Sequence, residues 1–332
     1  MRAAGSAVER VVYLEIIAGT SEFYLEKETA AAIGKFDGIH IGHRKLLEEI
    51  LIRKKDGLAA CVFTFDPAPA VLFGSSDGKE LTTREEKRLL FERMGVDILV
   101  EFPLTKHTAA MVPEDFVRLV LSEQMRVKFL AAGSDLSFGA GGRGDAELLR
   151  HMGLELNFSV KIIPKVCVES REVSSTLVRE QVAGREVSST LVREQVEAGN
   201  MELTQKLLGM PYFIAGEVAA GNQLGRRLGF PTVNLLPSDS KLLPPNGVYF
   251  SQVLHRGRMY RAVSNVGYKP TVTDRHVMGV ESYLYDFDSQ IYGESIEVYL
   301  LRFRRPEQHF ESVDALREML REDIAAGVNF EP

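Results

Sequence analysis

The order of strand-like and helix-like segments is the feature that most restricts the fold of this 332-residue chain. In its first part, apolar stretches of strand length alternate with segments whose apolar residues recur at helical spacing. The strand-like stretches are residues 30–36, 58–65, 96–102 and 128–133, and the helix-like segments are residues 43–55, 83–95 and 113–125. Strands separated by helices need crossover connections, so we predict an α/β domain with a parallel sheet and a ligand site beyond the carboxyl ends of the strands.

The pattern changes near residue 211, where short and often alternating strands separated by Gly, Pro, Asn or Asp begin. They are residues 212–219, 247–255, 259–267, 280–287 and 295–303. This spacing predicts a small antiparallel β-barrel. The last segment, residues 312–326, predicts one closing helix with Ser312 as its N-cap. One face of that helix carries Val313, Leu316, Leu320 and Ile324. We therefore predict two domains, residues 1–200 and 201–332.

Composition limits the classes of protein to which the chain can belong. Hydrophobic residues make up 45% of it, and 40 basic residues against 46 acidic ones leave a net charge of −6. This balance argues against a protein that coats nucleic acid, and no apolar run approaches the roughly 18–20 residues of a membrane span. We predict a cytoplasmic protein that binds neither membranes nor nucleic acid. Cys61 and Cys167 lie in strand-like runs and are predicted to be two buried thiols.

The turn between the first strand and the first helix has the sequence GKFDGIHIGH, residues 34–43. Its glycines, Gly34, Gly38 and Gly42, let the backbone come close to a ligand. His40 and His43 are three residues apart at a helix start and can point the same way. Together with the helix N-terminus they would form a cationic cradle for phosphates. A structural pair of histidines, or a metal site completed by distant carboxylates, is the alternative interpretation.

The ten-residue string resembles the signature of the FAD synthetase half of prokaryotic bifunctional riboflavin kinase/FMN adenylyltransferases, members of the HxGH nucleotidyltransferase superfamily. Residues 64–69, TFDPAP, and 133–144, GSDLSFGAGGRG, resemble further motifs of that half, although Ala68 and Leu136 depart from its pattern. The resemblance implies a Rossmann-like domain in which the FMN phosphate attacks the α-phosphorus of ATP and releases pyrophosphate. Because the attacking phosphate is already anionic, catalysis would rest on positioning and on neutralising charge.

The same resemblance implies roles for individual residues. His40 and His43 would be catalytic, with Mg²⁺ as partner. Nucleotide and phosphate binding would fall to Gly34, Phe36, Asp37, Gly38, Gly42, Asp135 and Gly139. Flavin binding would involve Pro67 and Phe138. Asp37 orients the site or has a structural role in the turn.

A second motif opens the barrel half. Residues 228–234, LGFPTVN, resemble the riboflavin kinase signature, and residues 247–249 and 265–271 agree with the same family. Gly225, Arg226 and Gly229 suit a flap around phosphates, and Thr232 and Asn234 alternate along an extended segment as oxygen ligands for Mg²⁺. The resemblance further implies that Glu281 accepts the proton of the riboflavin hydroxyl and that Asn265 and Thr271 contact the flavin. Riboflavin, FMN and ATP would be the substrates.

Twelve residues, REVSSTLVREQV, occur twice, at 171–182 and 185–196. The family carries one such segment, whose hydroxyl groups and arginine reach the ATP phosphates at a helix start. The two sets of candidates are Ser174, Ser175, Thr176 and Arg179, and Ser188, Ser189, Thr190 and Arg193. We expect the first copy to be active, because it follows directly from a strand-like run, and the second to be an extra helical turn or loop.

Two other functions stay open at this point. One is an HxGH transferase that acts on a different phosphate ester and carries an unrelated barrel. The other is a flavin-binding sensor in which the transferase half has decayed, as Ala68, Leu136 and the duplication would allow. The intact His40 and His43 argue against such decay.

Overall fold

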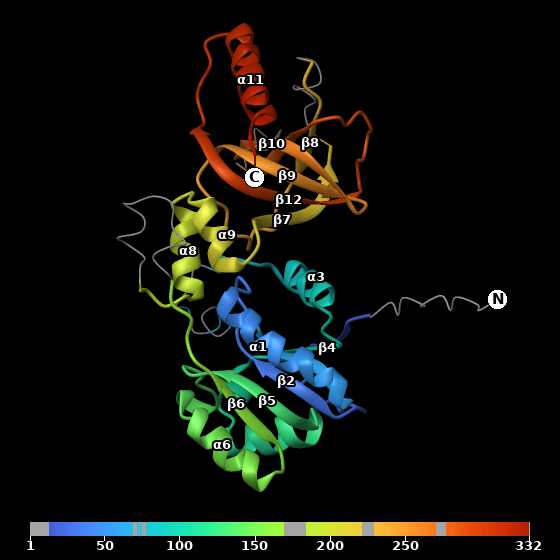
Figure 1. Cartoon of the computed structure of the whole chain (residues 1–332), viewed down its shortest axis with the longest axis vertical. Helices are drawn as coiled ribbons and strands as arrows, with labels where there is room; N and C mark the ends of the chain where they lie inside the picture. Colours follow the sequence, from blue (N-terminus) through green and yellow to red (C-terminus); the bar gives the residue numbers. More distant parts are fainter. Residues whose placement is uncertain are drawn as a thin grey trace, which may run out of the picture. The chain divides into compact units, whose positions relative to one another are not determined.

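The computed structural model describes residues 13–68, 72, 74, 78–168, 184–220, 229–269 and 277–331 (Figure 1). The chain divides into two units of dense internal contact. The first comprises Met1–Phe36, Gly42–Gly78 and Lys87–Lys165; the second comprises Asp37–Ile41, Lys79–Glu86 and Val166–Pro332. Two short segments from the N-terminal half therefore count with the C-terminal unit. A boundary after residue 200 between parts that fold alone stays a prediction.

A six-stranded sheet forms the centre of the first unit, with strand order β1-β4-β3-β2-β5-β6 and parallel pairing throughout. The strands are β1 (Glu15–Ala18), β2 (Thr29–Ile33), β3 (Ala59–Asp66), β4 (Ile98–Pro103), β5 (Val127–Gly133) and β6 (Ser159–Ile163). Every residue of the central strand β2 is buried, as expected for a strand covered on both faces. The predicted parallel α/β domain is confirmed.

The helices of this unit follow the predicted apolar spacing, with one difference in hydrogen bonding. They are α1 (Ile41–Ile52), η1 (Arg53–Asp56), α3 (Arg84–Met94), α4 (Lys106–Ala109), α5 (Pro113–Asp115), η2 (Phe116–Gln124), η3 (Ala140–Gly142) and α6 (Ala146–Glu155). The segment predicted as one helix over residues 113–125 is α5 followed by the π-helix η2, in which the Met125 amide donates to the Val120 carbonyl five residues back. Apolar spacing identifies the buried face of a helix but not its hydrogen-bond pattern.

The second unit is built on a closed six-stranded barrel with strand order β10-β11-β8-β7-β12-β9. Its strands are β7 (Tyr212–Ala219), β8 (Thr232–Leu235), β9 (Gly247–His255), β10 (Arg258–Lys269), β11 (Val277–Leu284) and β12 (Ser295–Pro306), all paired antiparallel. Closure leaves no edge strand in this sheet, which removes the risk of pairing with another chain. The predicted antiparallel barrel is confirmed.

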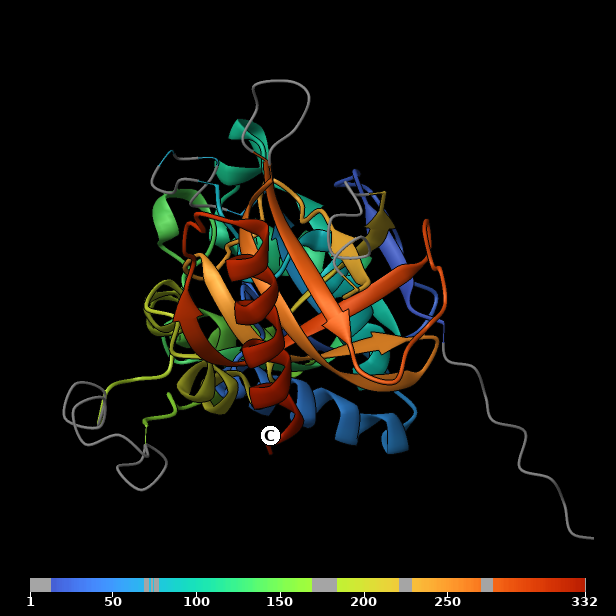
Figure 2. The same ribbon diagram turned by 90° about the horizontal axis from the view of Figure 1, so that it is seen from above.

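The described helices that accompany the barrel include α8 (Ser189–Glu197), α9 (Met201–Leu208) and α11 (Val313–Val328). Helix α11 is the predicted closing helix, and the Ser312 hydroxyl caps it by accepting a hydrogen bond from the Ala315 amide. Figure 2 shows α11 against the barrel strands, and it contacts β10. Val313, which the sequence pattern placed on one face with Leu316, Leu320 and Ile324, is 57% exposed.

The second copy of the repeated dodecapeptide forms α8 and the residues before it. Leu191, Val192 and Val196 are all fully buried in the core of the second unit. Burial of three such side chains stabilises a helix by roughly 1.5–3 kcal/mol each. The second copy is therefore a packed helix and not a loop, and the choice of the active copy stays a prediction.

The segment before α8 also corrects the prediction for one cysteine. Cys167 pairs with Glu186 in an isolated antiparallel bridge, and its side chain is exposed rather than buried. Cys61, on β3, is fully buried as predicted, and burial raises the pKa of its thiol.

Candidate functional sites

A cavity of about 650 Å³ lies between the barrel strands and helix α11. Its apolar wall comes from Phe230, Val248, Val263, Tyr283, Leu316, Leu320 and Ile324. The polar groups among its lining residues include Asn265, Glu281 and Glu307. A cavity whose wall is mainly apolar and carries a smaller number of polar groups is typical of a small-molecule site.

Helix α11 is fixed beside this cavity by a buried carboxylate and a phenol. Asp323 is only 2% exposed and forms ion pairs of 2.7 Å with both Arg304 and Arg305 of β12. The Tyr285 hydroxyl donates to the Ile324 carbonyl, and burial raises the pKa of Tyr285 to about 12. These contacts attach the wall of the cavity to the barrel.

Glu281 and Thr232 meet at the place where this cavity adjoins a second one. The Thr232 hydroxyl donates to Glu281 Oε1 at 2.5 Å, because β11 and β8 are neighbouring strands. Thr232 and Asn234 also line a smaller cavity of about 230 Å³, whose far wall is formed by the loop after β11, including Phe287, Asp288 and Tyr292. Thr232 lines both cavities, so a group bound in one lies next to a group bound in the other.

Parallel strands all end on the same side of a sheet, so the motifs at residues 34–43, 64–69 and 133–144 lie at the carboxyl ends of neighbouring strands. Gly34 follows β2, Pro67 follows β3 and Asp135 follows β5, and β2 lies between the other two strands. The Gly34 amide donates to the Phe63 carbonyl, which ties the turn after β2 to the adjacent strand. Asp135 is exposed and lies 3.6 Å from Lys165. Open α/β sheets bind their ligands beyond these carboxyl ends of the strands.

Asp37 is held on several sides within the second unit. Its Oδ1 accepts a hydrogen bond from the Leu81 amide at 2.8 Å, and its Oδ2 pairs with Arg193 at 3.0 Å. Its carbonyl accepts a hydrogen bond from the Ser189 hydroxyl at 2.7 Å. Gly38 follows with a φ of 75°, and an added Cβ would lie 2.7 Å from Leu81, so only glycine fits there. The turn is thus fixed by residues from α8 and from residues 79–86.

His40 and His43 flank the first residues of α1, which begins at Ile41. His40 is 8% exposed, while the His43 ring is half-buried and packs on Phe36 with 4.9 Å between ring centroids. Gly42 lies in the first turn of the same helix. The N-terminus of α1 therefore coincides with the two histidines, as the phosphate-cradle interpretation requires.

The second copy of the repeat supplies Ser188, Ser189, Thr190 and Arg193 to one helix start. Ser188 caps α8 by accepting a hydrogen bond from the Leu191 amide at 3.2 Å. Arg193, one turn later, donates to Asp37 Oδ2 and to the Lys79 carbonyl. Thr190 is exposed. This copy therefore adjoins the Asp37 turn.

Two predicted site residues are packed in a core, and two predicted glycines have a positive φ. The side chains of Phe36 and Phe138 are 0% and 4% exposed, and Phe138 packs on Phe116 in the core of the first unit. Gly139 has a φ of 69°, and a Cβ there would lie 2.6 Å from Pro113. Gly229, at the end of the predicted flap, has a φ of 91°.

Several predicted residues lie outside the described part of the chain. They are Ser174, Ser175, Thr176, Arg179, Gly225, Arg226 and Thr271.

Sequence reasoning gave no role to several residues that shape the two cavities. Tyr283, Glu307 and the loop around Phe287 line them, and all lie in the stretch from residue 281 onward that resembles the riboflavin kinase family. The amphipathic face of residues 312–326 was a further signal, since Leu316, Leu320 and Ile324 form part of the larger cavity's wall.

Within the described ranges, no three His, Cys, Asp or Glu side chains gather closely enough to hold a metal ion. A search of the same residues for a helix with the length and apolar character of a membrane span finds none.

Comparisons with known proteins agree with both halves. A family model described as FAD synthetase matches residues 24–177, and one described as riboflavin kinase matches residues 208–330. The FAD synthetase match ends inside the first copy of the repeat. Because the two copies are identical, this end point does not show which copy corresponds to the family's segment.

Curated relatives match nearly the whole chain. A bifunctional riboflavin kinase/FMN adenylyltransferase of Escherichia coli strain K12 is 35% identical over 88% of this chain and 89% of its own. A protein of the same name from Listeria monocytogenes is 31% identical over 92% of this chain and 93% of its own. A crystal structure described as a macrolide-efflux protein of Streptococcus pneumoniae is 29% identical, with a TM-score of 0.81, over 96% of this chain and 100% of that one. By its two family matches and by its similarity to these relatives along most of its length, the chain belongs to the family of bifunctional riboflavin kinase/FMN adenylyltransferases.

Proposed function

We propose that this chain phosphorylates riboflavin to FMN in its barrel and then adenylylates FMN to FAD with its N-terminal half, releasing pyrophosphate. The observation that carries the proposal is the position of Glu281 and Thr232 where the two barrel cavities adjoin. The larger, mainly apolar cavity suits the flavin, and the smaller one suits the nucleotide.

Glu281 would act as the general base of the kinase reaction. Its carboxylate faces the larger cavity and would accept the proton of the riboflavin primary hydroxyl as that oxygen attacks the γ-phosphorus of ATP. The hydrogen bond from Thr232 keeps the carboxylate oriented. Asn265, beside it in the cavity, would contact the flavin.

Thr232 and Asn234 fit a role in holding Mg²⁺. The Thr232 hydroxyl directs its hydrogen at Glu281, which leaves the oxygen lone pairs for a cation, and Asn234 offers an amide oxygen from the same side of β8. Two protein oxygens suffice, because Mg²⁺ in such sites takes its other ligands from phosphates and water. The ion would neutralise charge on the ATP phosphates when bound.

The transferase reaction would use the turn at residues 34–43. The FMN phosphate needs no base, so His40, His43 and the α1 N-terminus would bind and neutralise the phosphates of ATP. Asp37 would be a positioning residue, since both of its carboxylate oxygens are already engaged. The contacts of Ser189 and Arg193 with Asp37 support the second copy of the repeat as the phosphate-binding one.

The two alternative functions have less support. An HxGH transferase acting on a different phosphate ester was expected to carry an unrelated barrel, but residues 208–330 match the riboflavin kinase family. A flavin-binding sensor without transferase activity is distinguished by assay: the protein is incubated with ATP, Mg²⁺ and either riboflavin or FMN, and the products are separated by chromatography. We expect FMN and FAD from the first mixture and FAD from the second. FMN without FAD would mean that the transferase half is inactive.

A cytoplasmic location and the absence of membrane and nucleic-acid partners remain predictions from composition.

A further inference from the structure

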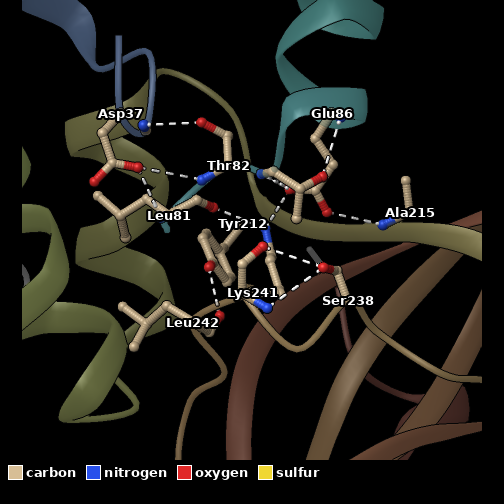
Figure 3. Close-up of polar contacts among 12 residues, drawn as sticks. Asp37, Leu81, Thr82, Glu86, Tyr212, Ala215, Ser238, Lys241 and Leu242 are labelled. Atoms are coloured by element: carbon tan, nitrogen blue, oxygen red, sulfur yellow. Dashed lines mark hydrogen bonds and ion pairs between the residues drawn. The ribbon is translucent and has the colours of Figure 1, made fainter. Parts of the chain in front are cut away.

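Lys241 is a charged side chain with almost no exposure to solvent. The Lys241 and Glu86 side chains are each 1% exposed, and Lys241 Nζ lies 2.6 Å from Glu86 Oε2 (Figure 3). Lys241 Nζ also donates to the Leu81 carbonyl at 2.8 Å and lies 4.3 Å from the centre of the Tyr212 ring. Burial lowers the pKa of Lys241 more than the neighbouring Glu86 raises it. A buried ion pair is a poor source of stability, so a role in fixing geometry is the better explanation to test.

Glu86 connects the barrel to the start of helix α3. Its Oε1 accepts a hydrogen bond from the Ala215 amide of β7, and its Oε2 accepts one from the Thr83 amide, both at 3.0 Å. The Glu86 amide in turn donates to the Thr83 hydroxyl, which completes a capping box. Every oxygen of this carboxylate is therefore satisfied by residues 83 and 215 and by Lys241.

Backbone pairing extends this attachment along residues 79–86. The Glu80 amide donates to the Ser240 carbonyl at 2.6 Å, and the Leu242 amide donates to the Glu80 carbonyl at 2.8 Å. Lys79 Nζ donates to the Asp239 carbonyl. Residues 79–86 are thus joined to residues 239–242 by main-chain hydrogen bonds as well as by the ion pair.

On their other side, residues 79–86 hold the turn at Asp37 and Gly38. The Leu81 amide donates to Asp37 Oδ1, and the Gly38 amide donates to the Thr82 hydroxyl at 3.0 Å (Figure 3). Arg193 bridges the two segments, since it donates both to Asp37 and to the Lys79 carbonyl. A shift of Leu81 and Thr82 would therefore move Asp37 and Gly38.

From this chain of contacts we infer that Lys241 and Glu86 are positioning residues of the adenylyl-transfer reaction. They hold residues 79–86 in place, and these residues hold the Asp37–Gly38 turn that precedes His40. The inference rests on the proposed function, namely on the assignment of residues 34–43 to the ATP phosphates. The two residues come from opposite halves of the sequence and are buried away from the assigned phosphate site. The inference gives them an indirect effect on ATP binding during FAD synthesis.

The test removes the ion pair without leaving one charge buried alone. In the double variant Lys241→Met/Glu86→Gln, we expect the KM for ATP in FAD formation to rise by about fivefold or more. The KM for FMN and the rate of riboflavin phosphorylation should stay within about twofold of wild type, since neither uses the turn. A purely structural role would reduce the amount of active protein and leave the KM for ATP unchanged.

Lys54→Met is the matched control, because Lys54 pairs with Asp97 at 2.7 Å near the amino ends of β3 and β4. Its KM for ATP should equal that of wild type; an equal rise would overturn the inference, as would a folded double variant with the wild-type KM. If the double variant does not fold, Thr82→Val decides, since it removes the partner of the Gly38 amide and should raise the same KM. An unchanged KM in Thr82→Val overturns the inference. Wild-type protein that makes FMN but no FAD would instead show that the proposed function fails.

Discussion

Glu281 is the residue on which the proposed kinase reaction depends most. Replacing it by Gln keeps the side-chain shape but removes the proton acceptor. We expect FMN formation to slow by about 10²–10⁴-fold, while FAD formation from added FMN is unchanged. Steady-state assays of the two reactions measure this directly.

Glu307 provides a matched control for that substitution. It lines the same cavity, but its carboxylate accepts hydrogen bonds from Asn246 and Asn265 instead of contacting Thr232. Glu307→Gln should therefore affect riboflavin binding more than the rate of the chemical step. An equal loss of kcat in both variants would contradict the base assignment.

Tyr285 gives the barrel a specific dependence on alkaline pH. Burial, with a smaller contribution from Tyr283, raises its pKa from 10.0 to about 12 in the folded protein. The neutral phenol is thus favoured by folding, so its contribution to stability is complete below pH 10 and is lost as the pH rises from 10 towards 12. We expect the thermal midpoint of the wild type to fall more steeply across this range than that of Tyr285→Phe. Parallel curves would mean that Tyr285 does not titrate differently in the folded state.

At the scale of elements, we expect opposite results from replacing the arginine of α8, Arg193, and the equivalent arginine of the first repeat copy, Arg179. Arg193 donates to Asp37 and to the Lys79 carbonyl, so Arg193→Ala removes hydrogen bonds worth on the order of 1.5–3 kcal/mol for the charged partner. FAD formation should fall about tenfold or more, with FMN formation unaffected. Arg179→Ala is the control and should have little effect. Equal small losses in both variants would mean that neither copy alone serves the site.

The elements themselves were largely predictable, because hydrophobic periodicity reports which face of a segment is buried. The strand predicted over residues 212–219 is β7, and the predicted closing helix is α11 with its Ser312 cap. Periodicity reports neither the hydrogen-bond pattern within a helix nor partners far apart in the chain. For these reasons the π-helical form of η2 and the pairing of Cys167 with Glu186 were missed.

The residues of the sites were predictable only where a motif names them. Thr232 and Glu281 belong to motifs, and the structure brings them into contact. Glu86 and Lys241 are 155 residues apart, and a single sequence carries no signal that they meet. Tyr283 and Phe287 line cavities because of barrel closure, which depends on all six strands together.

At the scale of the whole molecule, the contacts of residues 79–86 join segments that a linear division would separate. Asp37–Ile41 and Lys79–Glu86 belong by their contacts to the same unit as the barrel. A fragment that ends at residue 200 would retain both segments but lose Ala215, Ser240 and Lys241, which hold the second of them. The halves of this sequence are therefore less independent than their two family matches suggest.

The residues on either side of the first repeat copy lie close together, so one copy can be deleted with a short connection. Val168 donates to the Arg185 carbonyl, and Val187 donates to the Val166 carbonyl, so the chain on either side of the first copy is paired antiparallel. Deleting residues 171–184 would leave Glu169 and Ser170 as a two-residue connection between Val168 and Arg185, the commonest length for joining antiparallel strands. The same chain results if residues 183–196 are deleted instead, because the copies are identical.

We therefore expect the single-copy chain to fold and to form both FMN and FAD at rates within about threefold of the full chain, since loop length has only a small effect on stability. Its remaining copy should form α8 with the same buried face of Leu191, Val192 and Val196. Thermal unfolding and the two activity assays, carried out on both chains side by side, measure this. Loss of FAD formation with riboflavin phosphorylation intact would mean that both copies are needed, and the second copy alone could not then be the phosphate-binding segment.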